Sequence, residues 1–341
     1  MEAAAELLQE NCRAPATVQT RSSQLRAFDQ FCAEMAITNV PPSPREMVLF
    51  ASWLMLFHCT RESSLRQYLS AVKTYFSEKG MFVPAPSEFG PLRAVVDGSR
   101  RLFPGPTRKS KPVTIPILRN LIFSAPPPAA SWRSAMTLRI LKDTCLVLYF
   151  SMLRSSSLFP PWKGAADKDR NMIWDRVQFF EGGAKIIIIL AKTQQNFRRT
   201  HEVVLREKEN SPFCPVSALR RLRSMRGARA GGQDHVFQLP VGNSAAGPWR
   251  IMVKTDFHAW FKRRIAQMRL DSDLYMLHGF RHGAVALAIA EEPNLSLVKL
   301  ASDQSSNVIW EYAQVDASRR QSVATAMIEA VHLAGTAPRR Q

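Results

Sequence analysis

A ten-residue segment rich in proline and basic residues divides this chain and limits what it can fold into. Residues 103–112 hold three prolines, a glycine and three basic residues. Proline and glycine interrupt regular structure, and the positive charge keeps such a segment extended beside an anion. We therefore expect two folded parts, residues 1–102 and residues 113–341, joined by a basic linker at 103–112. A length of 341 residues suits two domains.

The part before the linker has apolar residues at helical spacing. Leu25, Phe28 and Phe31 recur on one face of an expected helix. Ser43 and Glu46 are spaced as a capping box around Pro44, which predicts the start of the next helix. This part is predicted to be a compact helical module, with helices over residues 3–9, 17–35, 44–59, 61–78 and 91–102.

The part after the linker alternates between helical and strand patterns. Residues 172–181 and 185–190 have strand character on either side of Gly182-Gly183, which predicts a hairpin turn, and residues 200–206 predict a third strand. Helices are expected over residues 115–123, 132–152, 216–226, 254–268, 278–290, 296–301, 307–312 and 317–333. The predicted fold class is mainly α with a small antiparallel β-sheet: an N-terminal helical domain followed by an α+β domain.

The net charge points to a polyanionic partner. Lysine and arginine number 46 against 28 acidic residues, a formal balance of +18. Self-repulsion of this size strains a compact protein unless an anion relieves it, so we expect double-stranded DNA as the partner. A basic surface with no specific partner is the alternative. A membrane surface is disfavoured because the basic residues are dispersed along the chain.

Neither a membrane, a secretory route nor a metal is indicated. No apolar run approaches the ~20 residues of a membrane helix, and the acidic N-terminus lacks the features of a secretory signal. The five cysteines are widely spaced, without a CxxC pair or zinc spacing. We expect an intracellular protein with reduced thiols, no bound metal and no cofactor.

His278, Arg281 and Tyr312 together predict chemistry on a phosphodiester. On a helix, residues three apart lie on one face, about 5–6 Å from each other. A histidine can pass a proton, and an arginine can grip a phosphate with two parallel hydrogen bonds. A tyrosine hydroxyl can attack phosphorus. Tyr312 follows Arg281 by 31 positions, and the small residues 283–288 permit tight packing of the histidine's helix.

This arrangement resembles the tyrosine recombinases, also called the phage-integrase family, whose signature is His-x-x-Arg followed by a nucleophilic tyrosine. The resemblance implies a core-binding domain, a catalytic domain and two further catalytic residues, Arg154 and Lys192. Arg154 would neutralise a phosphate oxygen, and Lys192 would protonate the departing 5′ oxygen. The alternatives are an ordinary helix-end cation at Arg154 and a solvated turn lysine at Lys192.

The segment before Tyr312 resembles a particular branch of that family, the crypton and DIRS-type transposon recombinases of eukaryotes. Gln304 stands where the family has histidine or tryptophan, and Ser157 stands where it often has an acidic residue. His282 matches a histidine common in the family pattern and is expected to orient a catalytic side chain without contacting the DNA itself. Glutamine can still hydrogen-bond a phosphate oxygen, so Gln304 is kept as a catalytic candidate.

The expected function is site-specific recombination or transposon integration through a 3′-phosphotyrosyl intermediate, without metal or ATP. The resemblance implies a tetramer on two DNA duplexes, and nuclear residence if the source is eukaryotic. A type IB topoisomerase and a non-cleaving, domesticated DNA-binding protein are the alternatives. Side chains expected to contact DNA come from the N-terminal helices, the linker and the hairpin: Arg21, Arg26, Ser64, Arg66, Gln67, Lys73, Arg108, Lys109, Lys111, Arg198 and Arg199.

Overall fold

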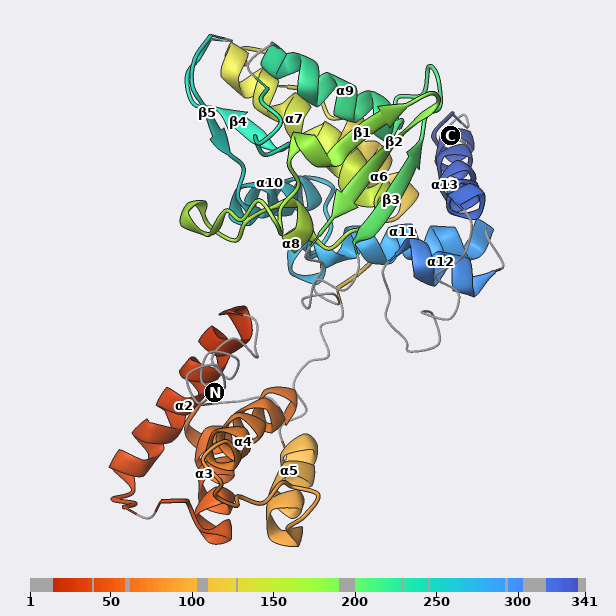
Figure 1. The fold of residues 1–341 in the computed structure, drawn as a ribbon. Coiled ribbons are helices and arrows are strands. Elements are labelled where there is room, and N and C mark those ends of the chain that lie inside the picture. Colours follow the sequence, from red (N-terminus) through yellow and green to blue (C-terminus); the bar gives the residue numbers. More distant parts are fainter. Residues whose placement is uncertain are drawn as a thin grey trace, which may run out of the picture. The chain divides into compact units, whose positions relative to one another are not determined.

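A computed structural model divides the chain into two compact units, Met1–Arg108 and Lys109–Gln341. The structure describes residues 15–38, 40–58, 62–102, 110–126, 128–189, 200–227, 230–244, 246–291, 294–302 and 317–336. Figure 1 shows the two units, each with its own layers of helices. None of the described helices combines the length and apolar character that crossing a membrane requires.

The first unit is helical and is held together by aromatic side chains. The rings of Phe28 and Phe50 meet edge to face with centroids 5.0 Å apart, and Phe31 lies 5.7 Å from Trp53. Such pairs stabilise a core beyond the area they bury. The described helices are α2 (Pro15–Glu34), α3 (Pro44–Phe57), α4 (Glu62–Ser77) and α5 (Gly90–Leu102).

The predicted capping box at the start of α3 is confirmed. The Glu46 amide donates to the Ser43 hydroxyl over 3.3 Å, and the Ser43 amide donates to the Glu46 carboxylate over 2.6 Å. These two bonds satisfy donors that a helix start otherwise leaves open. The expected helix over residues 3–9 lies outside the described residues.

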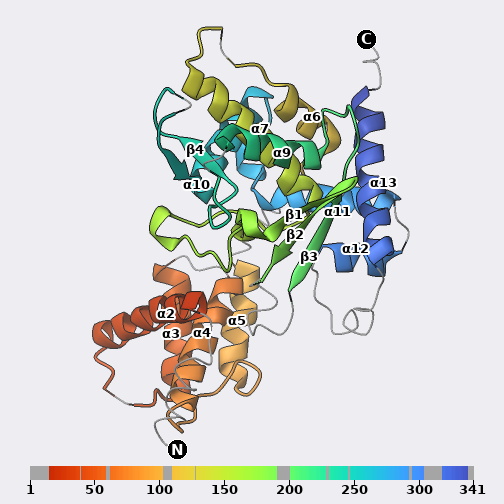
Figure 2. The same cartoon turned by 45° about the horizontal axis from the view of Figure 1, so that its top comes forward.

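The second unit is built around α7 (Trp132–Phe150), which is buried almost continuously from Ile140 onward. This helix packs against helices on several sides and against a short hairpin. Figure 2 shows α7 running between α6 and α9. The other helices of the unit are α6 (Ile115–Phe123), α8 (Ser155–Leu158), α9 (Pro215–Arg226), α10 (Lys254–Gln267), α11 (His278–Glu291), α12 (Leu295–Ala301) and α13 (Ala317–Thr336), with 3-10 turns η1 (Lys163–Ala165), η2 (Trp174–Arg176) and η4 (Ser272–Leu274).

A three-stranded antiparallel sheet lies beside these helices in the order β1 (Val177–Phe180), β2 (Gly183–Ile188), β3 (His201–Arg206). The register pairs Val177 with Ile186 and Ile186 with Val203. Alternate residues of β3 are buried, as expected for a sheet with one covered face. The structure therefore confirms a mainly α fold with a small antiparallel sheet.

The hairpin turn sits one residue earlier than the sequence predicted. Phe180 pairs directly with Gly183, so Glu181 and Gly182 form the loop. Gly182 has a φ of +70°, which glycine adopts without strain. Gly183 already belongs to β2, where a Cβ would lie 2.4 Å from the Phe180 ring. The first glycine therefore makes the turn, and the second makes room for Phe180.

A second, two-stranded sheet was not predicted. It pairs β4 (Gln238–Pro240) with β5 (Trp249–Ile251) in antiparallel fashion. Each strand is three residues long and one contains a proline, so neither shows the alternation from which strands are recognised. Its role in the fold is to cover α7, against which β4 packs.

Candidate active site

The first turn of α11 carries His278 and Arg281, and the two side chains differ sharply in exposure. His278 is exposed, whereas Arg281 is only 4% exposed. Because the residues are three apart on one helix, the histidine can meet a substrate at the surface while the guanidinium lies beneath it. The sequence predicted the shared face but not the burial of the arginine.

Arg281 reaches back to the segment that follows α7. Its Nη1 donates to the carbonyl oxygen of Met152 over 2.9 Å. Met152 has a φ of +51°, a left-handed conformation that is uncommon outside glycine. That conformation costs about 1 kcal/mol or more and persists only where surrounding structure fixes it. The strained residue is therefore the one that accepts a hydrogen bond from a predicted catalytic arginine.

Arg154 follows Met152 by two residues, so the bond from Arg281 joins the two segments that carry the predicted arginines. Consecutive Cα atoms are about 3.8 Å apart, which limits the Cα of Arg154 to within about 7.6 Å of that of Met152. The sequence placed residue 152 at the end of the helix, but α7 ends at Phe150. Arg154 instead caps α8 in extended conformation, and its side chain is partly exposed.

Ser157, near Arg154, is buried, whereas His282, near His278, is exposed. Ser157 is 7% exposed within α8, and its amide donates to the Arg154 carbonyl over 2.8 Å. His282 is exposed one turn after His278, and the two imidazole rings meet edge to face with centroids 4.2 Å apart. His282 therefore neighbours the predicted proton-transfer group directly on the surface of α11.

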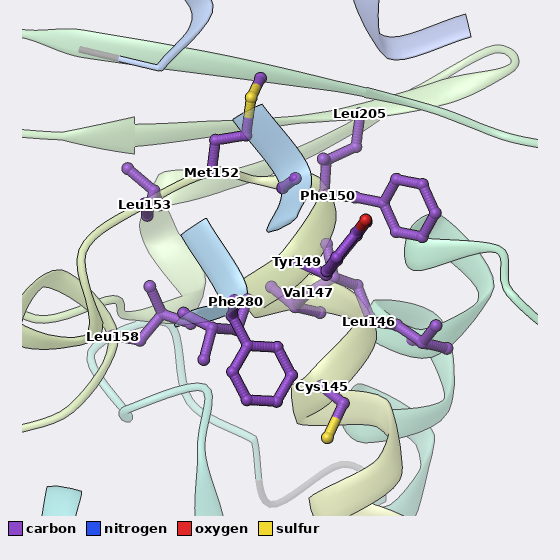
Figure 3. Packing of buried hydrophobic residues seen from close by; sticks show 14 of the residues in the cluster. Cys145, Leu146, Val147, Tyr149, Phe150, Met152, Leu153, Leu158, Leu205 and Phe280 are labelled. Atoms are coloured by element: carbon purple, nitrogen blue, oxygen red, sulfur yellow. The ribbon is translucent and has the colours of Figure 1, made fainter. Parts of the chain in front are cut away.

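Apolar packing fixes α11 from the side opposite the two histidines. Phe280 is fully buried, and its ring lies 4.9 Å from that of Phe261 and 5.9 Å from that of Phe257. Figure 3 shows the Phe280 side chain in the same cluster as Cys145 and Leu158, near the end of α7. Phe280, one of the two residues between His278 and Arg281, thus anchors the helix that presents them.

Three predicted catalytic residues lie outside the described residues: Lys192, Gln304 and Tyr312. Lys192 belongs to residues 190–199, which follow β2 and precede β3 in the sequence. The DNA-contact candidates Arg198 and Arg199 belong to the same range. The DNA-contact candidates Arg108 and Lys109 also fall outside. Lys111 is described and its side chain is exposed.

The described tyrosines of the second unit are both buried. Tyr149 is 1% exposed and Tyr275 is 7% exposed. Burial raises the pKa of the Tyr149 phenol well above its ordinary value, because desolvation disfavours the phenolate. Neither hydroxyl is suited to attack a phosphate at the surface. Tyr312 is the remaining tyrosine of this unit.

In the first unit, three of the predicted DNA-contact residues are engaged with carboxylates of the protein. Arg21 holds Glu78 through two hydrogen bonds of 3.0 and 2.7 Å, and Lys73 lies 2.7 Å from Glu88. Arg66 is paired with Glu62 and lies 3.7 Å from Asp97. Arg26 and Gln67 are exposed, whereas Ser64 is half-buried. The pairing of Arg21 with Glu78 spans 57 residues of chain, so the sequence did not reveal it. The pairing of Arg66 with Glu62 has i,i+4 spacing on α4, which the sequence does contain.

The sequence also missed a group of residues that pack against α11. Residues 110–114 belonged to the predicted linker or followed it, yet they are bonded to the second unit. The Lys111 amide donates to the Leu274 carbonyl over 2.7 Å, and the Val113 amide donates to the Gly279 carbonyl over 2.8 Å. Gly279 stands directly between His278 and Phe280. The only signal in the sequence was the pair of glycines in the helix.

The chain resembles a number of solved structures, among them a transposon integrase and a site-specific recombinase. The Tn1549 transposon integrase in complex with transposon right end DNA has a TM-score of 0.56 at 14% identity, covering 96% of this chain and 97% of that one. The XerH site-specific recombinase bound to palindromic difH substrate has a TM-score of 0.53 at 14% identity, covering 90% and 79%. No protein-family model and no curated protein matches the sequence.

These likenesses run over nearly the whole chain, with both the first and the second unit included in the matched length. At 14% identity they establish the architecture and not the chemistry. The chain has the fold of tyrosine-recombinase-type integrases.

Proposed function

We propose that this protein is a DNA strand transferase that cuts and rejoins DNA through a 3′-phosphotyrosyl intermediate. The observation that carries the proposal is the hydrogen bond from Arg281 to the Met152 carbonyl, which links the segments of two predicted phosphate-binding arginines. The fold shared with a transposon integrase and a site-specific recombinase supports the same reading. The high positive charge supports DNA as the substrate.

The proposed reaction exchanges one phosphoester for another. The Tyr312 hydroxyl loses its proton and attacks the phosphorus, and the bond from phosphorus to the 5′ oxygen breaks. His278 assists the proton transfer, and Lys192 protonates the leaving 5′ oxygen. Arg154, Arg281 and Gln304 stabilise charge on the phosphate oxygens. A 5′ hydroxyl from a second strand reverses the step, so the bond energy is conserved without ATP or a metal.

Assignment of the nucleophile to Tyr312 is supported by exclusion. A phenol has an unperturbed pKa of about 10, so it needs nearby cations and access to the phosphate. Tyr149 and Tyr275 are buried in the core of the second unit. Tyr68 and Tyr75 belong to the first unit, whereas α11 belongs to the second.

The finer features of the proposal come from the family resemblance. They are a kinship with crypton or DIRS-type elements, nuclear residence if the source is eukaryotic, and a tetramer on two duplexes. Exchange of the helix after Tyr312 between neighbours would require α13 to leave β3 and α11, against which it packs. It would also break the 2.6 Å pair between Lys208 and Glu329 of α13.

A covalent-capture experiment tests the proposal. Wild-type protein is mixed, in EDTA and without ATP, with a library of random-sequence DNA duplexes that carry one nick. The nick lets a short fragment diffuse away after cleavage, so the adduct accumulates. We expect an SDS-resistant adduct with the wild type and none with Tyr312→Phe. Absence of the wild-type adduct, or an equal yield from the variant, would refute the assignment.

The two alternatives predict different outcomes in related assays. A type IB topoisomerase would relax a supercoiled plasmid without exchanging strands between duplexes. A non-cleaving DNA-binding protein would shift the duplexes in a native gel yet yield no adduct. The recombinase proposal expects the adduct and joining of its DNA to a second strand bearing a 5′ hydroxyl.

A further inference from the structure

The extended segment 110–114 is docked along the start of α11. The Lys111 amide donates to the Leu274 carbonyl over 2.7 Å, just before the helix. The Ser110 hydroxyl accepts from the Met276 amide over 3.2 Å. The Val113 amide donates to the Gly279 carbonyl over 2.8 Å, and the Val113 side chain is fully buried. Ser110 and Lys111 are thus bonded to the residues just before α11, and the backbone of Val113 is bonded to the first turn of the helix.

Two glycines of α11 make this close approach possible. A Cβ on Gly279 would lie 2.5 Å from the Lys111 carbonyl oxygen, and a Cβ on Gly283 would lie 1.9 Å from that of Val113. Backbone atoms cannot move aside as the end of a long side chain can. Glycine weakens a helix interior, so two glycines one turn apart indicate that this contact constrains the sequence.

The docked segment is one of three contacts that fix the helix carrying the predicted catalytic residues. Phe280 fixes α11 against α10, and Arg281 fixes it to the segment after α7. Gly279 lies immediately next to His278, and both Gly279 and Gly283 lie two residues from Arg281. A shift of segment 110–114 would therefore move both predicted catalytic side chains together.

We propose that segment 110–114 is a positioning element, which through Gly279 and Gly283 holds His278 and Arg281 in the geometry needed for DNA cleavage. The inference rests on the proposed strand-transfer function. Catalytic groups must lie within about 0.5 Å of their productive positions, and a displacement of about 1 Å can cost on the order of 100-fold in rate. Through the two glycines, the docking acts on the rate of cleavage. The expected contact of the exposed Lys111 side chain with DNA is separate, and the variants below leave it in place.

The experiment compares Gly283→Ala with Gly98→Ala. Gly98 lies in α5, and a Cβ there meets nothing within 4 Å, so it is a matched control for a helical glycine. The substrate is a nicked duplex recovered as an adduct in the covalent-capture experiment. Its cleavage under single-turnover conditions gives a rate constant and an adduct yield, and fluorescence anisotropy gives the affinity for DNA. We expect Gly283→Ala to lower the rate constant by about 10-fold or more, with yield and affinity close to wild type. Gly98→Ala should match the wild type in all three.

A second pair of variants avoids the steric clash. Ser110→Ala removes the acceptor for the Met276 amide without adding bulk, and Ser110→Thr keeps a hydroxyl. Loss of one hydrogen bond should slow cleavage by about 3- to 10-fold in Ser110→Ala, and Ser110→Thr should restore the rate. These variants keep the inference testable if Gly283→Ala does not fold.

Amide exchange separates the docking from the chemistry. The Lys111 and Val113 amides should exchange slowly in the wild type and faster in Gly283→Ala. A wild-type rate constant despite faster exchange would overturn the positioning role. So would a loss of yield alone, which indicates fewer folded molecules. If the wild type forms no adduct, the proposed function fails and the role in cleavage fails with it, whereas slow exchange would still report the docking.

Discussion

Arg281 donates a hydrogen bond to the carbonyl oxygen of Met152, a residue held in a left-handed conformation two positions before Arg154. The contact joins residues 129 positions apart in the sequence. It connects the start of α11, which carries Arg281, to the segment between α7 and α8, which carries Arg154. The guanidinium therefore has a structural partner as well as a proposed catalytic task.

Replacing Arg281 by lysine should nearly abolish cleavage while leaving the protein folded. An ammonium keeps the charge but cannot reproduce the planar fork that holds a carbonyl oxygen and a phosphate at once. Loss of one stabilising group in a phosphate transition state costs on the order of 100-fold or more. Adduct formation by Arg281→Lys measures this. Arg263→Lys, at an exposed site on α10, is the control and should retain the wild-type rate.

Replacing Lys192 by alanine should slow cleavage in a way that a better leaving group reverses. Without the proposed acid, the 5′ oxygen must depart as an alkoxide. A substrate with sulfur at the bridging 5′ position departs as a thiolate, which needs no proton because a thiol has a pKa of about 8.5. We expect the sulfur substrate to restore the rate of Lys192→Ala and not that of Arg281→Lys. A failure to restore it would assign Lys192 another role.

The sequence predicted those parts of the fold that local chemistry determines. The capping box of Ser43 and the bounds of α6 are as expected, because caps and breakers act within a few residues. The predicted end of α7 was two residues too late, because Met152 has a left-handed conformation and accepts a hydrogen bond from Arg281 on the distant helix α11. The β4–β5 pair was missed because strands of three residues carry no period.

For the candidate site, too, the sequence predicted the local features and missed those that depend on distant contacts. Residue types and their spacing identified His278 and Arg281 as candidates, because the chemistry of these side chains is known from their type. The family resemblance added Arg154. The burial of Arg281 and the docking of segment 110–114 depend on tertiary contacts. The small residues after Arg281 signalled close packing, and the structure confirms this at Gly283. Nothing in the sequence indicated that the partner would be the end of the predicted linker.

Replacing Arg26 by glutamine should weaken DNA binding and reduce its salt dependence. Arg26 is exposed on α2, so its charge is accessible to a phosphate. Each phosphate contact contributes about 0.9 to the slope of log affinity against log salt concentration. We expect Arg26→Gln to lower that slope by about 0.9 in anisotropy titrations. Arg21→Gln should change it less, since Glu78 already neutralises Arg21; an equal change would contradict this.

Replacing Arg221 by methionine should destabilise the second unit, and more so at alkaline pH. Asp143 of α7 is 3% exposed and accepts from Arg221 Nε over 3.1 Å. Burial raises the pKa of Asp143, and the hydrogen bond from Arg221 opposes that rise. Without the arginine the pKa rises further, and the buried carboxylate has lost its main partner. We expect a loss of about 2 kcal/mol near pH 8, below the 3–5 of a fully buried pair because Arg221 is partly exposed.

The pH dependence of that loss has a definite sign. With its pKa raised above the unfolded value, Asp143 binds a proton more readily in the folded state, so stability relative to wild type recovers as pH falls toward that pKa. Urea unfolding at pH 8, 7, 6 and 5 should show a smaller difference from wild type at pH 5 than at pH 8, with the decrease setting in as the pH approaches the raised pKa of Asp143. Arg220→Met, which breaks an exposed pair with Glu207, should cost less than about 1 kcal/mol. A difference for Arg221→Met that stays constant across this range would mean that Asp143 is not the group left unpaired.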